Sequence, residues 1–203
     1  MAEVELPGKG RIEALTDGIF AVAMTLLVLD LRLVESAENL AQALASLGVK
    51  FENYVISFLV LCVFWLGHHR LMQVVRHVDA SFLWLNLLFL LAITFVPFAT
   101  SVLGEHPGSS GGALLYGANL AAILGIQAGM WRHTFHRLAD TSAGDPLERW
   151  RGVRLRFGGA FAIVAVACVA ALADWRFAAY VYLAFFFLGV AAPKVTERTW
   201  GRR

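Results

Sequence analysis

The residues most able to do chemistry stand at the start of the first long apolar segment. Arg11, Glu13 and Asp17 all precede a run that is almost wholly apolar. A charge at the centre of a bilayer costs at least about 2.5–3.5 kcal/mol and persists only with a partner or water. Arg11 and Asp17 lie about 120° apart around a helix, so they do not face each other. Asp17 therefore needs a partner from another helix, another subunit or water, unless these charges lie at the membrane interface.

Large apolar residues recur along the same segment at alternating spacings of four and three. They are Leu15, Ile19, Val22, Leu26, Leu29 and Leu33. A seam of this kind lets copies of one helix pack around a shared axis. The adjacent face carries Gly18, Ala21 and Thr25, small residues that permit close helix approach in lipid. A leucine-rich helix with accidental periodicity would show the same pattern.

Histidines gather near the ends of two further apolar segments. They are His68, His69, His77, His133 and His136. Clustered histidines can hold iron, zinc or haem, so a membrane metal enzyme is one interpretation. The chain has a lone His-His pair, however, and no carboxylate-rich partner. It also has no nucleotide loop and no nucleophile beside a base, so we expect no enzymatic activity, no bound metal and no cofactor.

The elements that position these residues are membrane helices. Hydrophobic residues make up 59% of the 203 residues and charged residues 16%, whereas soluble domains average about 45–50% and about 25%. Six runs are long enough to span a bilayer. They are Ile12–Leu33, Tyr54–Val75, Phe82–Leu103, Ala113–Trp131, Phe157–Ala173 and Phe177–Pro193. The predicted fold is an all-α membrane protein, with residues 1–203 forming a single six-helix transmembrane domain. Pro97 should kink the third span.

The placement of Lys and Arg predicts the orientation of the chain. The two ends and the loops on their side of the membrane hold fourteen, and the other side holds only Arg32, Lys50 and Arg176. Positive residues favour the cytoplasmic side, so both termini should be cytoplasmic. The segment Val34–Lys50 has leucines at helical spacing and is a candidate amphipathic connector. A net charge of +2 gives no indication of nucleic-acid binding.

Several motifs together resemble a known family. The run R-x-x-x-L-T-D-G at residues 11–18 resembles the R-x-x-x-F-S-D-G signature of the bacterial relatives of the endolysosomal potassium channel, the transmembrane protein 175 family. The similarity continues at residues 64–70 (F-W-x-x-H-H-R), 83–89 (L-W-L-N-L-L-F) and 95–100 (F-x-P-F-x-T). Leu15 replaces Phe and Thr16 replaces Ser, which keeps a large apolar residue followed by a hydroxyl.

The resemblance implies a homotetramer in the bacterial cell membrane, with a central pore lined by the first helix of each subunit. It places rings of Val22, Leu26 and Leu29 at the constriction, in place of a carbonyl filter, and puts the hydroxyl of Thr25 close to the pore. It also implies a structural polar network, joined by one or both of the adjacent histidines. The network residues are Arg11, Thr16, Asp17, His68, His69, Trp84 and Asn86.

The function implied is that of a potassium-permeable channel, with potassium as the permeant ion. An apolar ring gates by dewetting, because a narrow apolar neck disfavours a hydrated ion. Potassium holds its water less tightly than sodium, so a modest preference for potassium is expected. A secondary transporter for a small cation is the main alternative. It would need charges near the midplane and matched broken helices, and this chain offers only Asp17 and Asp30 near the ends of one span.

Overall fold

The apolar segments form a bundle of long helices. The computed structural model describes residues 8–32, 39–45, 47–105, 109–138 and 146–173, and every element among them is a helix. In chain order these elements are α1 (Lys9–Val28), α2 (Leu40–Ala45), α3 (Gly48–Val74), α4 (Ala80–Thr94), α5 (Val96–Glu105), α6 (Ser110–His133), the π-helix η1 (Thr134–Leu138) and α7 (Pro146–Ala173). The predicted all-helical class is confirmed over this part of the chain.

Four helical stretches of the described chain are long and apolar enough to cross a membrane. They are Gly48–Val74, Ala80–Glu105, Ser110–Arg137 and Gly152–Ala170. They overlap the second to fifth predicted spans. The first predicted span corresponds to α1, whose initial turns carry charged residues, and the sixth, Phe177–Pro193, lies outside the described residues.

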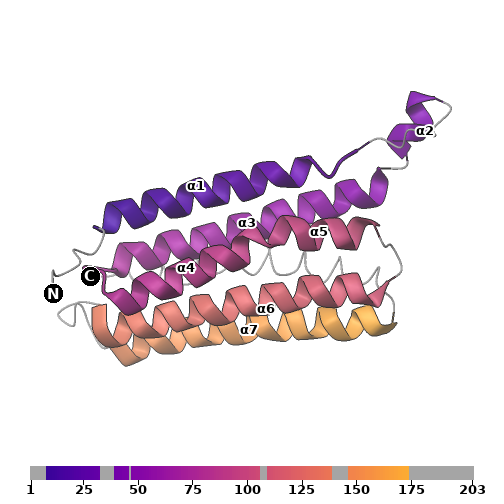
Figure 1. Ribbon diagram of the computed structural model, residues 1–203. Coiled ribbons are helices and arrows are strands. Elements are labelled where there is room, and N and C mark those ends of the chain that lie inside the picture. Colours follow the sequence, from indigo (N-terminus) through magenta and orange to yellow (C-terminus); the bar gives the residue numbers. More distant parts are fainter. Residues whose placement is uncertain (1–7, 33–38, 46, 106–108, 139–145, 174–203) are drawn as a thin grey trace, which may run out of the picture.

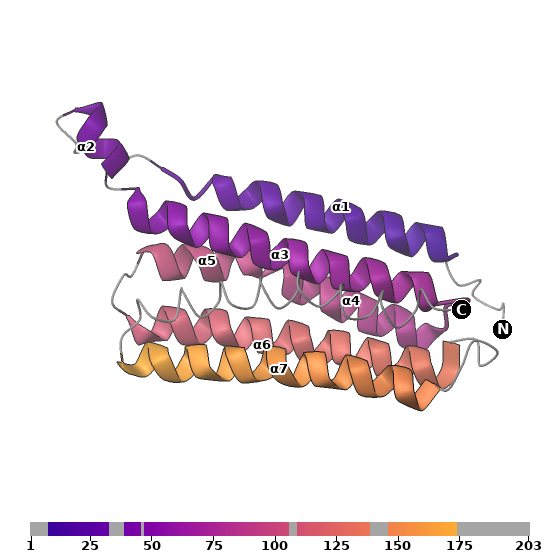
Figure 2. The same cartoon turned by 180° about the vertical axis from the view of Figure 1, so that it is seen from behind.

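The helices run roughly parallel or antiparallel along one axis (Figure 1). Helix α1 lies along one side of the bundle and contacts α3, α4 and α5, whereas α7 lies along the other side against α6 (Figures 1 and 2). The short helix α2 stands off one end of the bundle, within the segment predicted to be an amphipathic connector. The opposite end gathers the start of α1, the ends of α3 and α6, and the starts of α4 and α7.

The third predicted span is divided into two helices, as expected from Pro97. Helix α4 begins at the N-cap Asp79, whose side chain accepts a hydrogen bond from the Phe82 backbone N–H at 2.7 Å. It ends at Thr94, and α5 begins at Val96. Proline lacks an N–H and crowds the preceding turn, so the helix breaks just before it. The side-chain amide of Asn119 on α6 donates to the Ala92 carbonyl near the break at 3.2 Å.

Helix α1 ends earlier than its apolar pattern suggested. The pattern continues to Leu33, but regular α-helix stops at Val28. The N–H groups of Leu29 and Leu31 bond to carbonyls three residues back, at 3.1 Å each, which tightens the last turn. Just beyond it, the carboxylate of Asp30 accepts a hydrogen bond from the Ser101 hydroxyl of α5 at 2.7 Å.

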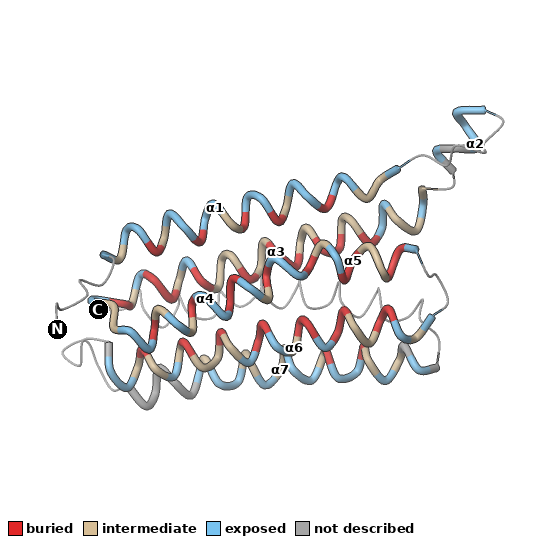
Figure 3. The backbone as a smooth tube through the Cα atoms, in the orientation of Figure 1, coloured by how far each residue is buried: buried red, intermediate tan, exposed pale blue. Residues whose placement is uncertain are grey.

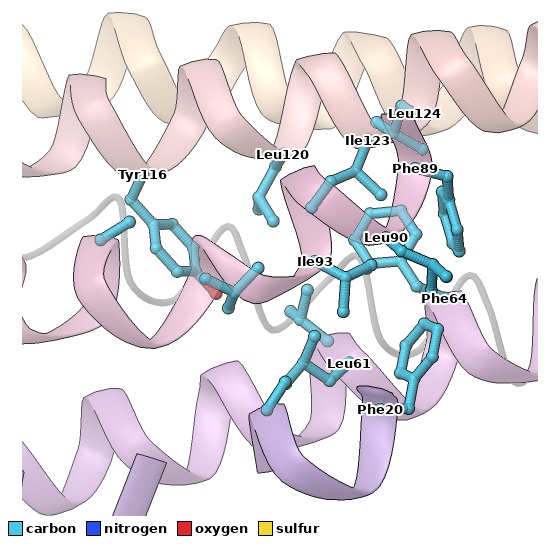
Figure 4. Close-up of a cluster of buried hydrophobic side chains, with 14 of the residues drawn as sticks. Phe20, Leu61, Phe64, Phe89, Leu90, Ile93, Tyr116, Leu120, Ile123 and Leu124 are labelled. Carbon is cyan, nitrogen blue, oxygen red and sulfur yellow. The ribbon is translucent and has the colours of Figure 1, made fainter. Parts of the chain in front are cut away.

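The core lies where α1, α3, α4 and α6 meet. Buried residues form a stripe on each helix, and the stripes face one another across the bundle (Figure 3). Aromatic and branched side chains from the four helices interdigitate there, with Phe20 tilted against Phe89 at 5.9 Å between ring centroids (Figure 4). This packing presents one face of α1 to the rest of the chain and leaves the opposite face outside.

Candidate functional site

Helix α1 has two faces with opposite surroundings. Its buried residues recur at helical spacing and pack into the core; they are Ile12, Thr16, Phe20, Ala23 and Leu27. Four large residues of the predicted seam lie on the other face: Leu15, Val22, Leu26 and Leu29. Ile19 is partly buried against the core, and Leu33 lies outside the described residues. Leu26 is 44% exposed although its neighbour Leu27 is only 2% exposed, and Val22 and Leu29 are 53% and 60% exposed. These exposed seam residues are therefore not used for packing within the chain.

The small residues predicted beside the seam also face outwards. Gly18, Ala21 and Thr25 are all exposed. A methyl group added at Gly18 would meet no atom of the described chain within 4 Å. The Thr25 hydroxyl donates to the Val22 carbonyl of its own helix at 2.9 Å. This bond satisfies the hydroxyl donor and leaves its oxygen on the outward face.

Three of the predicted network residues form a buried chain of hydrogen bonds between α1, α3 and α4. His68 Nε2 lies 2.9 Å from Asn86 Oδ1, and Asn86 Nδ2 donates to Thr16 Oγ1 at 3.4 Å. An amide oxygen only accepts, so His68 carries its proton on Nε2. The imidazole also stacks on Phe89, with ring centroids 5.5 Å apart. All three polar side chains are buried, so each depends on the others for hydrogen bonding.

Asp17 and His69 take part in a separate, exposed group. The indole Nε1 of Trp65 donates to Asp17 Oδ1 at 2.8 Å, which links α3 to α1. The Trp65 ring stacks on His69 at 5.5 Å, and His69 Nε2 lies 3.2 Å from the Gln73 amide. Of the two adjacent histidines, His68 thus joins the buried chain and His69 the exposed group.

Two predicted members of the network lie apart from it. Arg11 is exposed, and its guanidinium makes no hydrogen bond or ion pair with any other described residue. Trp84 is 67% exposed on the outer side of α4. Within the described chain, then, the structure brings together Thr16, Asn86 and His68.

Trp65 is the contact that sequence reasoning missed. It stands inside a motif that supported the family resemblance, yet it was given no role. Two hydrogen-bonding requirements together could have identified Trp65. A carboxylate in an apolar span requires a donor from another helix, and an indole N–H in an apolar span requires an acceptor.

Both ends of α1 are also hydrogen-bonded to other parts of the chain. At the first turn, Lys9 Nζ donates to the Val75 carbonyl in the α3–α4 loop at 3.2 Å. At the other end, Asp30 bonds to Ser101, as described above. These contacts hold α1 against α3 and α5 at its two ends, with the seam facing away.

Among the remaining histidines, His133 is hydrogen-bonded to Asp79 where α6 ends. Its Nε2 lies 2.8 and 3.0 Å from the two carboxylate oxygens of Asp79. Burial pushes the pKa of Asp79 upwards, but the hydrogen bonds from the Phe82 N–H and from His133, with the charges of His133 and His77, lower it overall. His133 thus secures the N-cap of α4.

The histidines do not form a metal site in the part of the chain that the structure describes. No group of three or more His, Cys, Asp or Glu side chains there is arranged to hold a metal ion. His68, His69 and His133 instead contact Asn86, Gln73 and Asp79 respectively. Their roles in this region are contacts within and between helices.

Comparison with known proteins agrees with this architecture. The sequence model of the family described as "Endosomal/lysosomal potassium channel TMEM175" matches residues 11–97. A protein of Streptomyces collinus named as a potassium channel is 32% identical over 186 residues, which is 88% of this chain and 90% of the relative. One of Chamaesiphon minutus, also named as a potassium channel, is 35% identical over 171 residues, covering 78% and 82%.

A solved structure has the same fold. The crystal structure of a lysosomal potassium-selective channel TMEM175 homolog from Chamaesiphon minutus superposes with a TM-score of 0.80 at 26% identity. It covers 91% of this chain, and this chain covers 97% of it. With the apolar helices described above, these similarities identify an integral membrane protein. The chain belongs to the TMEM175 family.

Proposed function

We propose that this protein is a potassium-permeable channel, formed by a homotetramer in which α1 of each subunit lines a central pore. The bacterial relatives are named as potassium channels, and the family members are named as channels rather than enzymes. Val22, Leu26 and Leu29 form the constriction, and the Thr25 hydroxyl lies next to it.

The observation that carries the proposal is the outward face of α1. Four seam residues are exposed in the subunit, although the helix is packed tightly on its other side. They are Leu15, Val22, Leu26 and Leu29. Their spacing suits association of copies of one helix around an axis. Gly18 has open space in its own subunit, so its small size would serve contact with another copy.

The constriction selects by hydration. Three rings at successive turns would follow one another at about 5–6 Å along the axis. Such a neck stays dry when narrow and conducts when it wets or widens. No ring of fixed ligands replaces the lost water, so the preference for potassium over sodium is modest.

The topology completes the proposal. Residues 1–203 form one six-helix domain, with both termini in the cytoplasm, because fourteen of the Lys and Arg residues fall on that side. The prediction assigns the start of α1, the ends of α3 and α6, and the starts of α4 and α7 to the cytoplasmic side. These helix ends all lie at one end of the bundle (Figure 1). Asp17 and the buried chain of Thr16, Asn86 and His68 position α1 and do not contact the permeating ion.

Substitution of Leu26 by Asn tests the pore assignment. The amide wets the neck and offers oxygen to the ion, so potassium current should rise and discrimination against sodium should change. Leu91 on α4 is a matched control, since it is 68% exposed but lies on another helix. Leu91→Asn should leave permeation unaltered. Single-channel recording of the purified protein in planar bilayers, beside size-exclusion chromatography, measures both properties.

The outcomes separate the alternatives. An intact Leu26→Asn oligomer with the conductance and selectivity of the wild type would refute the pore assignment. Misassembly without a gain of current would show that Leu26 packs inside an interface. A secondary transporter would instead show reversal potentials that follow two ion gradients, whereas the channel follows the gradient of its permeant ion alone.

A further inference from the structure

The C-terminal end of α1, where the last ring of the proposed constriction lies, has little apolar packing against the rest of the chain. Leu27 is the last buried residue of the helix, and residues 28–32 are exposed or half-buried. Regular α-helix stops at Val28, directly before Leu29, which is 60% exposed. The position of Leu29 therefore depends on polar contacts rather than on burial.

Asp30 makes the polar contact that joins this end of α1 to another helix. Its Oδ1 accepts a hydrogen bond from the Ser101 hydroxyl of α5 at 2.7 Å. The other side-chain hydrogen bond of residues 28–32 stays within the segment, from Arg32 Nε to the Leu29 carbonyl at 3.4 Å. A hydrogen bond to a carboxylate is stronger than one between neutral groups. Among the described residues, this bond is thus the main restraint on the end of α1.

The carboxylate of Asp30 lies in a corner between α1, α3 and α5. Three side chains converge on Gly104 of α5, where an added Cβ would lie 3.6 Å from Asp30 Oδ2, 3.8 Å from Asn53 Nδ2 and 3.4 Å from Lys50 Cγ. Asn53 is 3% exposed, and its Nδ2 has no hydrogen-bond partner among the described residues. A buried donor without a partner favours negative charge beside it. The corner as a whole therefore favours keeping the Asp30 carboxylate where it is.

We propose that Asp30 is a positioning residue of the channel, whose bond to Ser101 holds Leu29 back from the pore axis and keeps the last ring wide enough to conduct. The inference rests on the proposed function, in which four copies of α1 surround that axis. Leucines that face one another across a narrow neck gain free energy by contact, because contact removes apolar surface from water. The bond from Asp30 to α5 opposes this collapse.

The test records single channels of the purified full-length protein in planar bilayers with potassium on both sides. Ser101→Ala removes the donor, which should shift the ratio of held to released α1 ends by about tenfold, so potassium current should fall several-fold. Asp30→Ala should cause the same loss, and the double variant should lose no more, because both changes break one bond. Leu29→Ala should restore the current in Ser101→Ala, because a methyl group is too short to close the ring.

Thr94→Ala is the matched control, since Thr94 is a hydroxyl residue on the same predicted span as Ser101. Thr94 is exposed, and its hydroxyl donates to the Leu91 carbonyl of its own helix at 2.8 Å. Its replacement should leave the current unaltered. Size-exclusion chromatography and Tm verify that each variant is an intact oligomer. Ser101→Cys keeps the side chain's shape with a weak donor, and it takes the place of Ser101→Ala if that variant fails to assemble.

Three results would overturn the inference. One is a wild-type current in Ser101→Ala. Another is a loss in Asp30→Ala without a loss in Ser101→Ala, since a carboxylate that attracts cations to the pore mouth does not need Ser101. The third is a failure of Leu29→Ala to restore the current. Each leaves the pore assignment standing if Leu26→Asn alters permeation; if Leu26→Asn is also without effect, the proposed function itself fails.

Discussion

Asn86 is the residue on which the buried hydrogen-bond chain depends, and replacing it by Leu should destabilise the folded protein. Asn86 is fully buried, accepts from His68 and donates to Thr16. Leu keeps the branched shape and the number of non-hydrogen atoms of Asn, although its methyl groups are larger, so the change chiefly removes the hydrogen bonds. The expected loss can be estimated from the two contacts.

The contact with His68 dominates the estimate. His68 is 3% exposed and its proton lies on Nε2, so without Asn86 a buried donor is left unsatisfied. A group in that situation costs about 1–3 kcal/mol. The bond to Thr16 is long, at 3.4 Å, and adds little. Measured hydrogen-bond couplings between membrane helices average about 0.6 kcal/mol and reach about 1.7, so we expect a total near 1–2 kcal/mol.

A double-mutant cycle with His68→Phe isolates the interaction. The ring stacked on Phe89 is kept, and the unsatisfied donor is removed. The double variant should therefore recover at least half of the stability lost in Asn86→Leu. Unfolding in mixed micelles, followed by circular dichroism as denaturing detergent increases, gives the free energies. Strict additivity of the two losses, or a wild-type free energy for Asn86→Leu alone, would contradict the reasoning.

Two further changes test the contacts at the membrane surface. Asp79 has a pKa lowered from 3.8 in the folded protein, so its ionised form stabilises the fold above that pH, and this contribution is lost as pH falls through the lower folded value. The Tm difference between wild type and Asp79→Asn should hence be positive at neutral pH and shrink progressively as pH falls below 3.8; an unchanged difference in acid would contradict it. Asp17→Asn keeps an acceptor for Trp65 but removes the charge, and it should lower the oligomer fraction in size-exclusion chromatography. If assembly is intact and only potassium selectivity is lost, Asp17 faces the ion instead.

The positions of most helices along the chain could be predicted from local sequence properties. The hydropathy runs located α3, α6 and α7, and Pro97 located the break between α4 and α5. Helix ends were predicted less well. The predicted spans end at Trp131 and resume at Phe157, but α6 continues to His133 and α7 already begins at Pro146. Arginine is a good helix former, so the edge of the apolar run need not end the helix.

The side-chain partners were predicted only in part. Thr16, Asn86 and His68 were expected in one network and do meet, but the choice between His68 and His69 was left open. Adjacent residues on a helix point about 100° apart, so either histidine could have faced the interior. The hydrogen bond between Trp65 and Asp17 depends on how α3 lies against α1. That arrangement cannot be predicted from a local sequence pattern.

The sequence by itself determined that this protein is a helical membrane protein, and its motifs indicated the family. Those properties depend on composition and spacing along one chain, because a bilayer accepts only long apolar segments whose backbone is internally bonded. Tertiary structure decided which face of α1 is buried within the chain. The leucines of the seam and the buried stripe of Phe20 and Leu27 have similar hydrophobicity. Only the packing of α3, α4 and α5 against one of them leaves the other, with Leu26, exposed.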